Sequence, residues 1–546
     1  MEEVKNAIHK AIKNLWNIEV DVVLSRPDKQ FGDVSSNVAL QIQHQCNESP
    51  REIAQKIVAE LGENGHFTKI DIAGPGFINL TLADSFLFGI LNEEDGTEYA
   101  DKTIVIETNN PNPFKAMHIG HAFNAIIADT IANLLEAGGA VVNRVSYHGD
   151  VGSHVGKSMY SLLLFADGDI QKIEQIPKDH RNSFMSEMYA KGAKAYKEDE
   201  AAKAKINELA KQSYLLEDTL YAEIYKLCKN WSFEQIKDLV NRLGNKAVDK
   251  QYLESDVQAP GVEIVKKNKK YFVESEGALV FPGSKYGSFD NVFVASNGYG
   301  LYGARDLGLI KAKNDDYHPQ KSYIVTAEEQ RDYFKGVISA AQLCMPNVID
   351  VTVNIATGTV RLTTGKMSSR NGEVVEVEWL LEQIHDAIKN RGAKPTKNVV
   401  VGAIRYEFLK TRVGSDVIFD INDAASISGN SGPYLQYAHA RACAILCKSS
   451  INNDEFTINA LDKNEHILLL KLSEYNEQKN RAITELMPHH LCTYLFELTQ
   501  VFNSFYEKSR VIGDDREAIR IRLVKEYKNI LASGLAILCI PAPEKM

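Results

Sequence analysis

Residues 102–147 contain the pattern that most restricts the fold: two short β-branched runs separated by a loop and a helix. KTIVIET (102–108) and VVNRVSY (141–147) have the composition of buried strands. Between them, residues 118–137 carry apolar side chains at helical spacing, and Gly138-Gly139 can end that helix. Two parallel strands joined by a helix form half of a doubly wound nucleotide fold, whose ligands bind at the carboxyl ends of the strands. The sequence therefore predicts an α/β Rossmann-type domain.

The same domain is expected to be interrupted. From about 160 to 260 the pattern is charged and helical, and from 260 to 296 it becomes glycine-rich and β-like. We interpret residues 160–296 as an inserted α+β region. The second half of the fold is then predicted to resume with the strand NVFVAS, followed by a helix from about Arg305 and the strands SYIVTA and DVTVNIA.

A chain of 546 residues is too long for one hydrophobic core, so several domains are expected. Residues 1–100 predict a small α+β domain with helices over 3–16 and 50–61. Residues 101–392 form the expected Rossmann domain with its insertion, and residues 393–546 read as an all-α domain.

Composition limits the location and the partners. No run of about 18 apolar residues occurs, and the N-terminus is an amphipathic helix rather than a signal peptide, so we expect a cytoplasmic chain without membrane contact. The seven scattered cysteines suit reduced thiols, and we expect Cys443 and Cys447 to pack in the core rather than to bind zinc. The net charge of −10 argues against nucleic acid, but basic residues recur from Lys508 to Lys528. That stretch predicts either a solvated face or a phosphate-facing surface.

The segment PNPFKAMHIGH (111–121) places two histidines at the first strand-to-helix turn. A metal site is one interpretation, but no third ligand is evident; a structural helix cap is another. The position favours a phosphate, because backbone N–H groups and the helix dipole attract anions there. Gly120 would let a ligand approach the backbone, and His118 and His121 could donate hydrogen bonds to a triphosphate.

A second loop, GKMSSRNG (365–372), follows the last predicted strand. Alone it reads as a surface turn, but together with the upstream histidines it predicts that Lys366 neutralises the β- and γ-phosphates. Two other phosphate signatures fail. GDVGSHVGKS lacks the first glycine of a Walker loop, and GYGLYG places tyrosines where a dinucleotide needs small residues.

HIGH and Lys-Met-Ser-Ser in this order resemble the class I aminoacyl-tRNA synthetases. The resemblance extends along nearly the whole chain to the arginyl-tRNA synthetase family. It rests on these segments: FGDVSSNVAL, GPGFINL, ETNNPNPFKAMHIGH, SYHGDVGSHVGK, LYGARDLG, the stretch from VGSDVIFD to YAHARACAIL, and PAPEKM. It implies an N-terminal domain that contacts the tRNA elbow, a catalytic domain and a helical anticodon-binding domain.

The resemblance also implies roles for residues. ATP would be bound with Mg²⁺ by Pro111, Asn112, His118, Gly120, His121, Lys366, Met367 and Ser368. Arginine would be bound by Glu107, Asn112, His118, Tyr302, Asp306 and Gln330, with Glu329 as an open alternative to Gln330.

An independent argument concerns the amino acid. A guanidinium is a planar fork of donors that is always charged, so its pocket needs carboxylates. Glu107 ends the first strand, and Asp306 follows Tyr302 by one helical turn. Two acids and a tyrosine suit arginine, although a strand-end residue and a helix-start residue can also be purely structural.

The tRNA contacts that the resemblance implies begin with Phe77 and Asn79, an aromatic to stack on a base and an amide to bond its edge. A core phenylalanine and an asparagine that closes a turn are equally open interpretations. Tyr434, Tyr437 and Arg441 share one helix face at the start of the anticodon domain, and some of them are expected to pack internally.

Lys115 is predicted to compensate for a lysine that the family pattern has and this chain lacks. Where Lys-Met-Ser-Lys-Ser has a second lysine, this chain has Ser369, and Arg370 stands one place late. Family members without that lysine often carry one just before HIGH, at the position of Lys115. Our hypothesis is that Lys115 supplies the missing charge and joins His118, His121 and Lys366 in catalysis.

The sequence thus predicts an arginine–tRNA ligase acting on L-arginine, ATP and tRNA-Arg. We expect a monomer, although no sequence feature determines the oligomeric state. Two alternatives stay open: a ligase of the HIGH type that adenylylates a small molecule, and a non-catalytic tRNA-binding paralogue.

Overall fold

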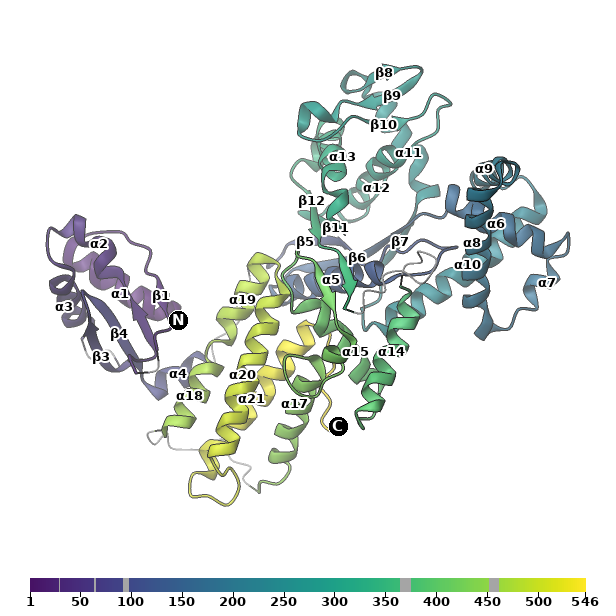
Figure 1. Cartoon of the computed structure of the whole chain (residues 1–546). Helices are drawn as coiled ribbons and strands as arrows, with labels where there is room; N and C mark the ends of the chain where they lie inside the picture. Colours follow the sequence, from purple (N-terminus) through teal and green to yellow (C-terminus); the bar gives the residue numbers. More distant parts are fainter. Residues whose placement is uncertain (29, 63–64, 92–97, 364–374, 451–460) are drawn as a thin grey trace.

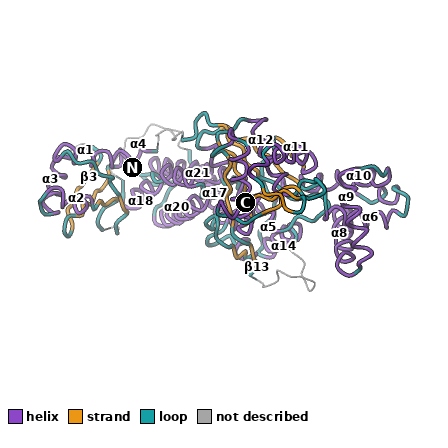
Figure 2. Tube along the Cα trace, turned by 90° about the horizontal axis from the view of Figure 1, so that it is seen from above, coloured by secondary structure: helices purple, strands orange, loops and turns teal. Residues whose placement is uncertain are grey.

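The computed structural model describes residues 1–28, 30–62, 65–91, 98–363, 375–450 and 461–546. It places an N-terminal domain at one end, a parallel sheet in the middle with one lobe above it and a helical lobe at the other end, and a helical C-terminal domain below the sheet (Figure 1). Seen from above, the N-terminal domain and helices α6 to α10 occupy opposite ends of an elongated molecule (Figure 2).

The N-terminal domain packs helices on an antiparallel sheet of order β1-β2-β4-β3. Its helices bury one apolar face each, and α3 begins with a capping box in which Ser49 and Glu52 exchange hydrogen bonds. The predicted helices over 3–16 and 50–61 are confirmed. The elements are α1 (Glu2–Trp16), β1 (Leu24–Ser25), β2 (Val34–Ser36), α2 (Val38–Cys46), α3 (Pro50–Leu61), β3 (Phe67–Ala73), β4 (Phe77–Leu82) and α4 (Asp84–Ile90).

The central sheet is entirely parallel, with the order β12-β11-β5-β6-β7. The helix after the first strand crosses over the sheet and ends at Gly138, so the predicted strand–helix–strand unit is confirmed. Gly139, with φ of 93°, turns the chain into the next strand. The elements are β5 (Thr103–Glu107), α5 (Ile119–Ala137), β6 (Val141–His148), β7 (Lys250–Leu253), β11 (Lys321–Ala327) and β12 (Thr352–Thr357).

Two lobes connect these strands. The first is a helical cluster with its own apolar core, formed by α6 (Ser153–Ala166), α7 (Gln171–Glu174), α8 (Arg181–Glu198), α9 (Glu200–Leu215) and α10 (Thr219–Arg242). The second lies above the sheet in Figure 1 and contains α11 (Glu254–Lys267), β8 (Val273–Ser275), β9 (Ala278–Phe281), β10 (Asn291–Val294), α12 (Tyr302–Tyr317) and α13 (Arg331–Cys344). Short 3₁₀ turns occur at 178–180, 269–271, 283–286, 328–330 and 346–348.

Two expectations about this region are wrong. β7 lies within the range 160–296 that we interpreted as an insertion, yet it pairs with β6 in the central sheet. NVFVAS was expected to resume the parallel sheet, but β10 pairs antiparallel with β9 in a separate three-stranded sheet. The two errors have different causes. β7 reads KQYL, whose two exposed polar residues give no strand signal. β10 reads NVFV, which identifies a strand but not the strand it pairs with.

The remainder is helical, as predicted, apart from one parallel strand pair. The elements are β13 (Val360–Leu362), α14 (Val377–Asn390), α15 (Lys397–Leu409), β14 (Val417–Phe419), α16 (Ile421–Ala424), α17 (Gly432–Leu446), α18 (Lys463–Leu472), α19 (Tyr475–Glu485), α20 (Pro488–Lys508) and α21 (Glu517–Ile537). One continuous apolar core joins these helices to α5 and to the N-terminal domain.

Candidate active site

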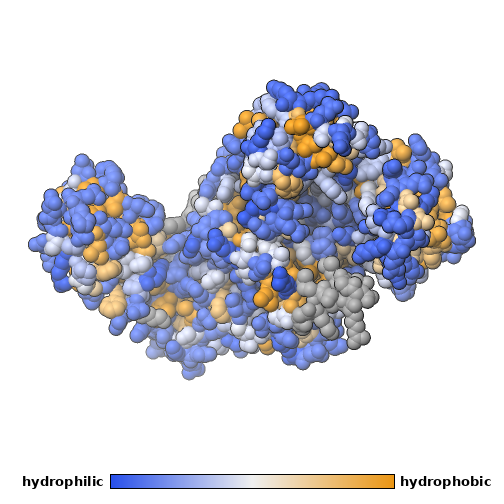
Figure 3. Space-filling model, turned by 45° about the horizontal axis from the view of Figure 1, so that its top comes forward, coloured by the Kyte–Doolittle hydropathy of each residue, from blue (hydrophilic) through white to orange (hydrophobic). Residues whose placement is uncertain are grey.

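A cavity of about 480 Å³ opens at the carboxyl ends of β5, β6 and β11. Most of the face above the C-terminal helices is hydrophilic, including the hollow beneath the upper lobe (Figure 3). The cavity brings together residues predicted separately for arginine and for ATP: Glu107, Pro111, Asn112, His121, Tyr302, Asp306, Glu329 and Gln330. His118 and Gly120 lie beside it at the start of α5. Both Glu329 and Gln330 line the cavity and are exposed, so the choice between them stays open.

Glu107 is buried and already has partners. One carboxylate oxygen accepts a hydrogen bond from Lys313 Nζ at 2.6 Å, and the other accepts one from Asn110 Nδ2 at 2.7 Å. Lys313 is itself 1% exposed. A buried carboxylate needs such compensation, because desolvation otherwise drives it to the neutral form.

Asp306 lies one turn beyond Tyr302 on α12. Its carboxylate accepts a hydrogen bond from the Tyr333 hydroxyl, and no described lysine or arginine forms an ion pair with it. Burial, with the nearby carboxylates of Glu107 and Glu254, raises the pKa of Asp306 to about 7. Tyr302 is 69% exposed at the cavity rim. Asp306 is therefore a buried carboxyl without a cationic partner among the described residues.

Three further cavity residues escaped the sequence prediction: Glu254, Tyr147 and Tyr333. Glu254 directly follows β7 and pairs with Arg305 at 2.6 Å. Tyr147 is near the end of β6, and its buried hydroxyl has no hydrogen-bond partner among the described residues. If β7 had been recognised as a strand of the central sheet, Glu254 would have been predicted as a cavity residue. Glu254 follows the end of a parallel strand, which is the rule that identified Glu107.

The two histidines of HIGH cap α5 reciprocally. His118 Nδ1 accepts from the backbone N–H of His121, and His121 Nδ1 accepts from that of His118, both at 3.3 Å. Each Nδ1 is thus an acceptor, so each ring carries its proton on Nε2 and can donate it to a ligand. Burial and the neighbouring Lys115 lower the pKa of His118 to about 4, and burial lowers that of His121 well below its usual range. Both imidazoles are neutral donors at pH 7.

Gly120 has a structural reason beyond ligand access. A Cβ at this position would lie 3.2 Å from ring atoms of His118. The two histidine rings stack with centroids 3.5 Å apart. A side chain at position 120 would push His118 out of this pair.

Lys115 is held next to a strained turn. Phe114 adopts a positive φ of 62°, which is costly for a residue with a side chain. Its N–H donates to Ser232 Oγ at 3.0 Å, and its carbonyl accepts from Ser158 Oγ at 2.9 Å. The half-buried Lys115 forms no ion pair among the described residues, and burial together with Lys157 lowers its pKa. An unpaired ammonium beside two imidazole donors suits a polyanion.

Lys366, Met367 and Ser368 lie outside the described residues, as do Ser369 and Arg370. The residues that follow them are described: the N–H of Ile119 donates to the carbonyl of Val375 at 2.9 Å, and Glu376 forms a β-bridge with His118. Val375 and Glu376, the first described residues after this loop, therefore lie directly against the start of α5.

A buried polar network holds α5 against the C-terminal helices. Arg405 of α15 is fully buried and donates to Asp129 Oδ2 at 3.0 Å and to Thr130 Oγ1 at 2.9 Å, both on α5. It also donates to the carbonyl of Leu538, just after α21, at 2.7 Å. The position of α5 thus depends on the helical domain.

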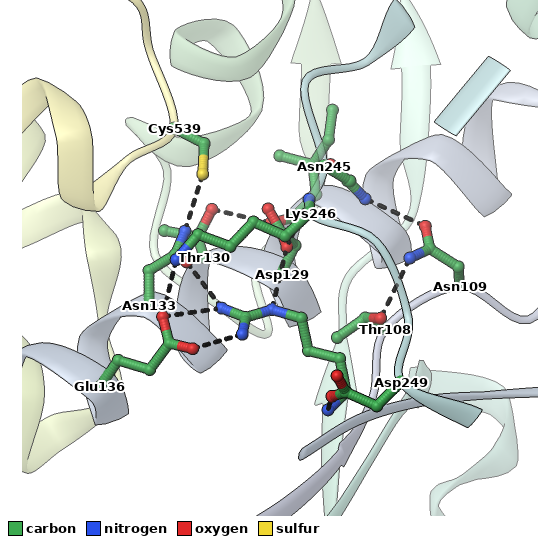
Figure 4. Close-up of polar contacts among 12 residues, drawn as sticks. Thr108, Asn109, Asp129, Thr130, Asn133, Glu136, Asn245, Lys246, Asp249 and Cys539 are labelled. Atoms are coloured by element: carbon green, nitrogen blue, oxygen red, sulfur yellow. Dashed lines mark hydrogen bonds and ion pairs between the residues drawn. The ribbon is translucent and has the colours of Figure 1, made fainter. Parts of the chain in front are cut away.

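The network continues to the cavity. Arg405 Nη1 donates to Asn245 Oδ1 at 2.6 Å, Asn245 Nδ2 to Asn109 Oδ1 at 3.0 Å, and Asn109 Nδ2 to Thr108 Oγ1 at 3.0 Å; Figure 4 shows the last two contacts. Thr108 lines the cavity beside Glu107. Hydrogen bonds therefore join the helical domain to the loop that carries the predicted substrate residues.

The two residues predicted to read the tRNA elbow differ in access. Phe77 is 40% exposed at the start of β4, so it is not a core residue. Asn79 is buried in the middle of β4, opposite Ser35 and Asp71. Phe77 can stack on a base as the chain stands, whereas Asn79 supports the strand and does not close a turn.

The anticodon-domain residues share one surface. Tyr437 is exposed, and the guanidinium of Arg441 lies 5.1 Å from its ring and 6.0 Å from that of Tyr506. Asn503 bonds both Arg441 and the half-buried Tyr434, which fixes the cluster. Two exposed aromatic rings around an arginine form a stacking platform. Tyr506 was not predicted.

Much of the basic stretch 508–528 is neutralised internally. Arg516 and Arg520 both bond the buried Glu465, and Arg522 pairs with Glu526 at 2.7 Å. The guanidinium of Arg516 and the N-cap of α18 lower the pKa of Glu465 to about 2. These three arginines are therefore structural, contrary to a continuous phosphate-facing surface.

Three general features complete the description. All seven cysteines are free thiols, and Cys228, Cys344 and Cys492 are buried. The expectation that Cys447 packs in the core is wrong, because this residue caps the end of α17 and is exposed, and Cys443 is only partly buried. No cluster of three or more His, Cys, Asp or Glu among the described residues is arranged to hold a metal ion. Within the described chain, no helix has both the length and the apolar character that a membrane span requires.

A parallel sheet with HIGH imidazoles beside an acid-lined cavity, continued by a helical domain, defines a class I aminoacyl-tRNA synthetase. Family models match the arginyl tRNA synthetase N-terminal domain over residues 2–82, the class I (R) tRNA synthetase catalytic domain over 89–422 and the DALR anticodon-binding domain over 435–546. The chain belongs to the arginyl-tRNA synthetase family.

Individual relatives agree over the full length. An arginine–tRNA ligase of Borrelia hermsii is 27% identical and is covered to 99%, with 100% of this chain covered. That of Idiomarina loihiensis is 28% identical over 96% of this chain and 95% of its own. The solved structure of Thermus thermophilus arginyl-tRNA synthetase has the same fold, with a TM-score of 0.81, 22% identity and complete coverage of both chains.

Proposed function

We propose that this chain is an arginine–tRNA ligase that activates L-arginine with ATP and transfers it to the 3′ end of tRNA-Arg. The observation that carries the proposal is that His121 lines the same cavity as Glu107 and Asp306. A donor for phosphate oxygens and acids for a guanidinium thus meet in one site, where an amino-acid carboxylate can reach the α-phosphorus.

Arginine enters with its guanidinium toward Asp306 and Glu107, while Tyr302 covers it from the rim. Asn112, whose side-chain oxygen accepts from the Gly149 N–H at 2.8 Å, presents its amide to the amino-acid end together with His118. The exposed Gln330 or Glu329 completes the wall. A planar fork can bond both acids at once, which a point-like ammonium cannot do.

In the first step a carboxylate oxygen of arginine attacks the α-phosphorus of ATP, and pyrophosphate leaves. The Nε2–H groups of His118 and His121 donate to the phosphate oxygens as charge develops, while Lys115 and Lys366 neutralise the triphosphate. Pro111, Gly120, Met367 and Ser368 shape the nucleotide site. In the second step a ribose hydroxyl of the terminal adenosine attacks the carbonyl carbon, and AMP leaves.

Mg²⁺ would enter with the nucleotide. Magnesium in such sites is held mainly by substrate phosphates and water. This suits a site in which no three acidic, histidine or cysteine side chains of the described residues are arranged to hold a metal. When bound, it would supply charge neutralisation to the β- and γ-phosphates.

We propose that tRNA binds along the faces that carry Phe77 at one end and Tyr437 and Arg441 at the other, with Asn79 and Tyr434 supporting them. We further propose that the chain acts in the cytoplasm, where its free thiols would stay reduced, and that it acts as a monomer.

ATP–pyrophosphate exchange with each of the twenty amino acids, with and without tRNA, tests the function. We expect exchange with arginine alone, stimulated by tRNA. Exchange with another small molecule and no arginine preference would favour an adenylyl-transferring ligase. Absence of exchange with retained tRNA binding would favour a non-catalytic paralogue.

A further inference from the structure

Two of the acids that line the cavity form ion pairs with buried basic side chains. Lys313 lies two turns beyond Asp306 on α12, on the same helix face, and its ammonium contacts Glu107 at 2.6 Å from behind the cavity. Arg305 contacts Glu254 at 2.6 Å in the same way. Both basic side chains are buried, Lys313 to 1% and Arg305 to 8% exposure.

These pairs divide the acids into two kinds. Glu107 and Glu254 each have a cation, whereas Asp306 has only the Tyr333 hydroxyl among its described hydrogen-bond and ion-pair partners. Burying an ammonium is expensive unless it is paired, so the contact between Lys313 and Glu107 is a built feature rather than a chance approach. One unpaired buried acid remains for one monocationic substrate.

We propose that Lys313 is a specificity-determining residue: by neutralising Glu107 internally, it reserves Asp306 as the single ion-pairing site for the substrate guanidinium. The proposal rests on the proposed arginine activation. Lys313 occupies the position on Glu107 that a substrate ammonium would take. The guanidinium of arginine can ion-pair with Asp306 and also donate to the remaining lone pairs of Glu107. The ammonium of a lysine substrate would have to compete for Glu107 with Lys313, which already occupies that position.

Proton linkage gives a direct readout. The groups facing the two acids are Tyr147 from β6, Tyr252 from β7, Glu254 from α11, Arg305 and Lys313 from α12, and Tyr333 from α13. Because the pKa of Asp306 is about 7, this carboxyl is mostly protonated at pH 6, and its ionisation on arginine binding should release close to one proton. In Lys313→Met the buried Glu107 would lose its paired cation, so its neutral form should be favoured until arginine binds, and the number of protons released should approach two.

The experiment compares Lys313→Met, Lys313→Arg and the double variant Glu107→Gln/Lys313→Met with the wild type. Lys311→Met is the matched control, because Lys311 lies on the same helix but pairs with Asp315 at the surface. Calorimetry of arginine binding in two buffers of different ionisation enthalpy counts protons, and exchange assays measure the preference for arginine over lysine.

We expect Lys313→Met to release nearly two protons and to lose at least tenfold of the arginine preference. Lys313→Arg and the control should stay near one proton, and the double variant should return to one because it has no unpaired Glu107. A folded Lys313→Met with the wild-type proton count and preference would overturn the proposal. If Lys313→Met does not fold, the double variant Glu107→Gln/Lys313→Met decides. Release of two protons by this double variant, or an unchanged preference for arginine over lysine, would overturn the proposal. Failure of the wild type to bind arginine would refute the proposed function itself, which separates the two.

Discussion

Arg405→Met should destabilise the junction between α5 and the helical domain more than any surface substitution can. Arg405 is completely buried and donates five hydrogen bonds. Their acceptors are the carbonyls of Leu243 and Leu538, Asn245 Oδ1, Asp129 Oδ2 and Thr130 Oγ1.

The size of the loss in unfolding free energy depends on the contacts that Asp129 keeps when Arg405 is removed. Removing one partner of a buried ion pair costs about 3–5 kcal/mol, mainly because the other charge stays buried. Asp129 would keep the backbone N–H of Lys246 at 3.1 Å and Arg144 Nε at 3.4 Å. Since that carboxylate retains a cation, we expect the lower part of the range, about 3–4 kcal/mol in the free energy of unfolding.

Urea unfolding followed by two probes is the assay, because a chain of several domains need not unfold in one step. Arg391→Met is the control: Arg391 donates only to the carbonyl of Asn422 at the surface, and its loss should cost no more than about 0.5 kcal/mol. In Asp129→Asn/Arg405→Met the losses should be less than additive, by roughly 0.5–3 kcal/mol. A loss below about 1 kcal/mol for Arg405→Met would refute the reasoning, as would strict additivity.

Four further outcomes are expected. Lys115→Ala should lower the exchange rate roughly 10²- to 10³-fold while changing the arginine KM little, and an exchange rate equal to that of Lys69→Ala, an exposed control, would leave Lys115 a surface lysine. Because arginine binding needs an ionised Asp306, the KM for arginine should rise about tenfold per pH unit as the pH falls below 7, and a flat profile from pH 6 to 8 would contradict this assignment. His466 bridges Asp33 and Asp84 of the N-terminal domain, and the hydrogen bond to Asp33 leads the causes that raise its pKa to about 9. Because this pKa is raised, protonated His466 stabilises the contact between the N-terminal domain and α18 fully below pH 6.5. The contact should lose on the order of 3 kcal/mol of stability as the pH rises through 9. Hydrogen exchange of the backbone at this contact, compared at pH 7 and 10, checks the sign. Tyr437→Ala should weaken tRNA binding by roughly 1–3 kcal/mol without affecting tRNA-independent arginine binding, as filter binding and calorimetry can show.

The sequence was sufficient where structure depends on neighbours in the chain. The first strand, α5 and the second strand follow from local periodicity, and the strand-end rule placed Glu107 at the cavity. Tyr302 and Asp306 follow from helical spacing on α12. The role of the Lys366 loop stays a prediction, because the loop lies outside the described part of the chain.

Prediction failed where the deciding partner is distant in the sequence. β10 has a strand-like composition, but its partner β9 is set by long-range pairing. The arginines of 508–528 look like a solvent-facing run because Glu465, which neutralises two of them, lies about fifty residues earlier. No local pattern marks Lys313 as the partner of Glu107, 206 residues away.

The same distinction explains how the site can be both acidic and selective. A pocket that attracted arginine only by accumulating carboxylates would hold several buried charges and would accept any cation. Here the acids come from β5, α11 and α12, and two of the three are paired with cations of α12. Of these three buried acids only Asp306 has no cation among the described residues, and at that carboxylate the fork geometry of the ligand can be distinguished. On this proposal selectivity depends on residues that do not touch the ligand, which is why a motif search identifies the acids and misses the cations paired with them.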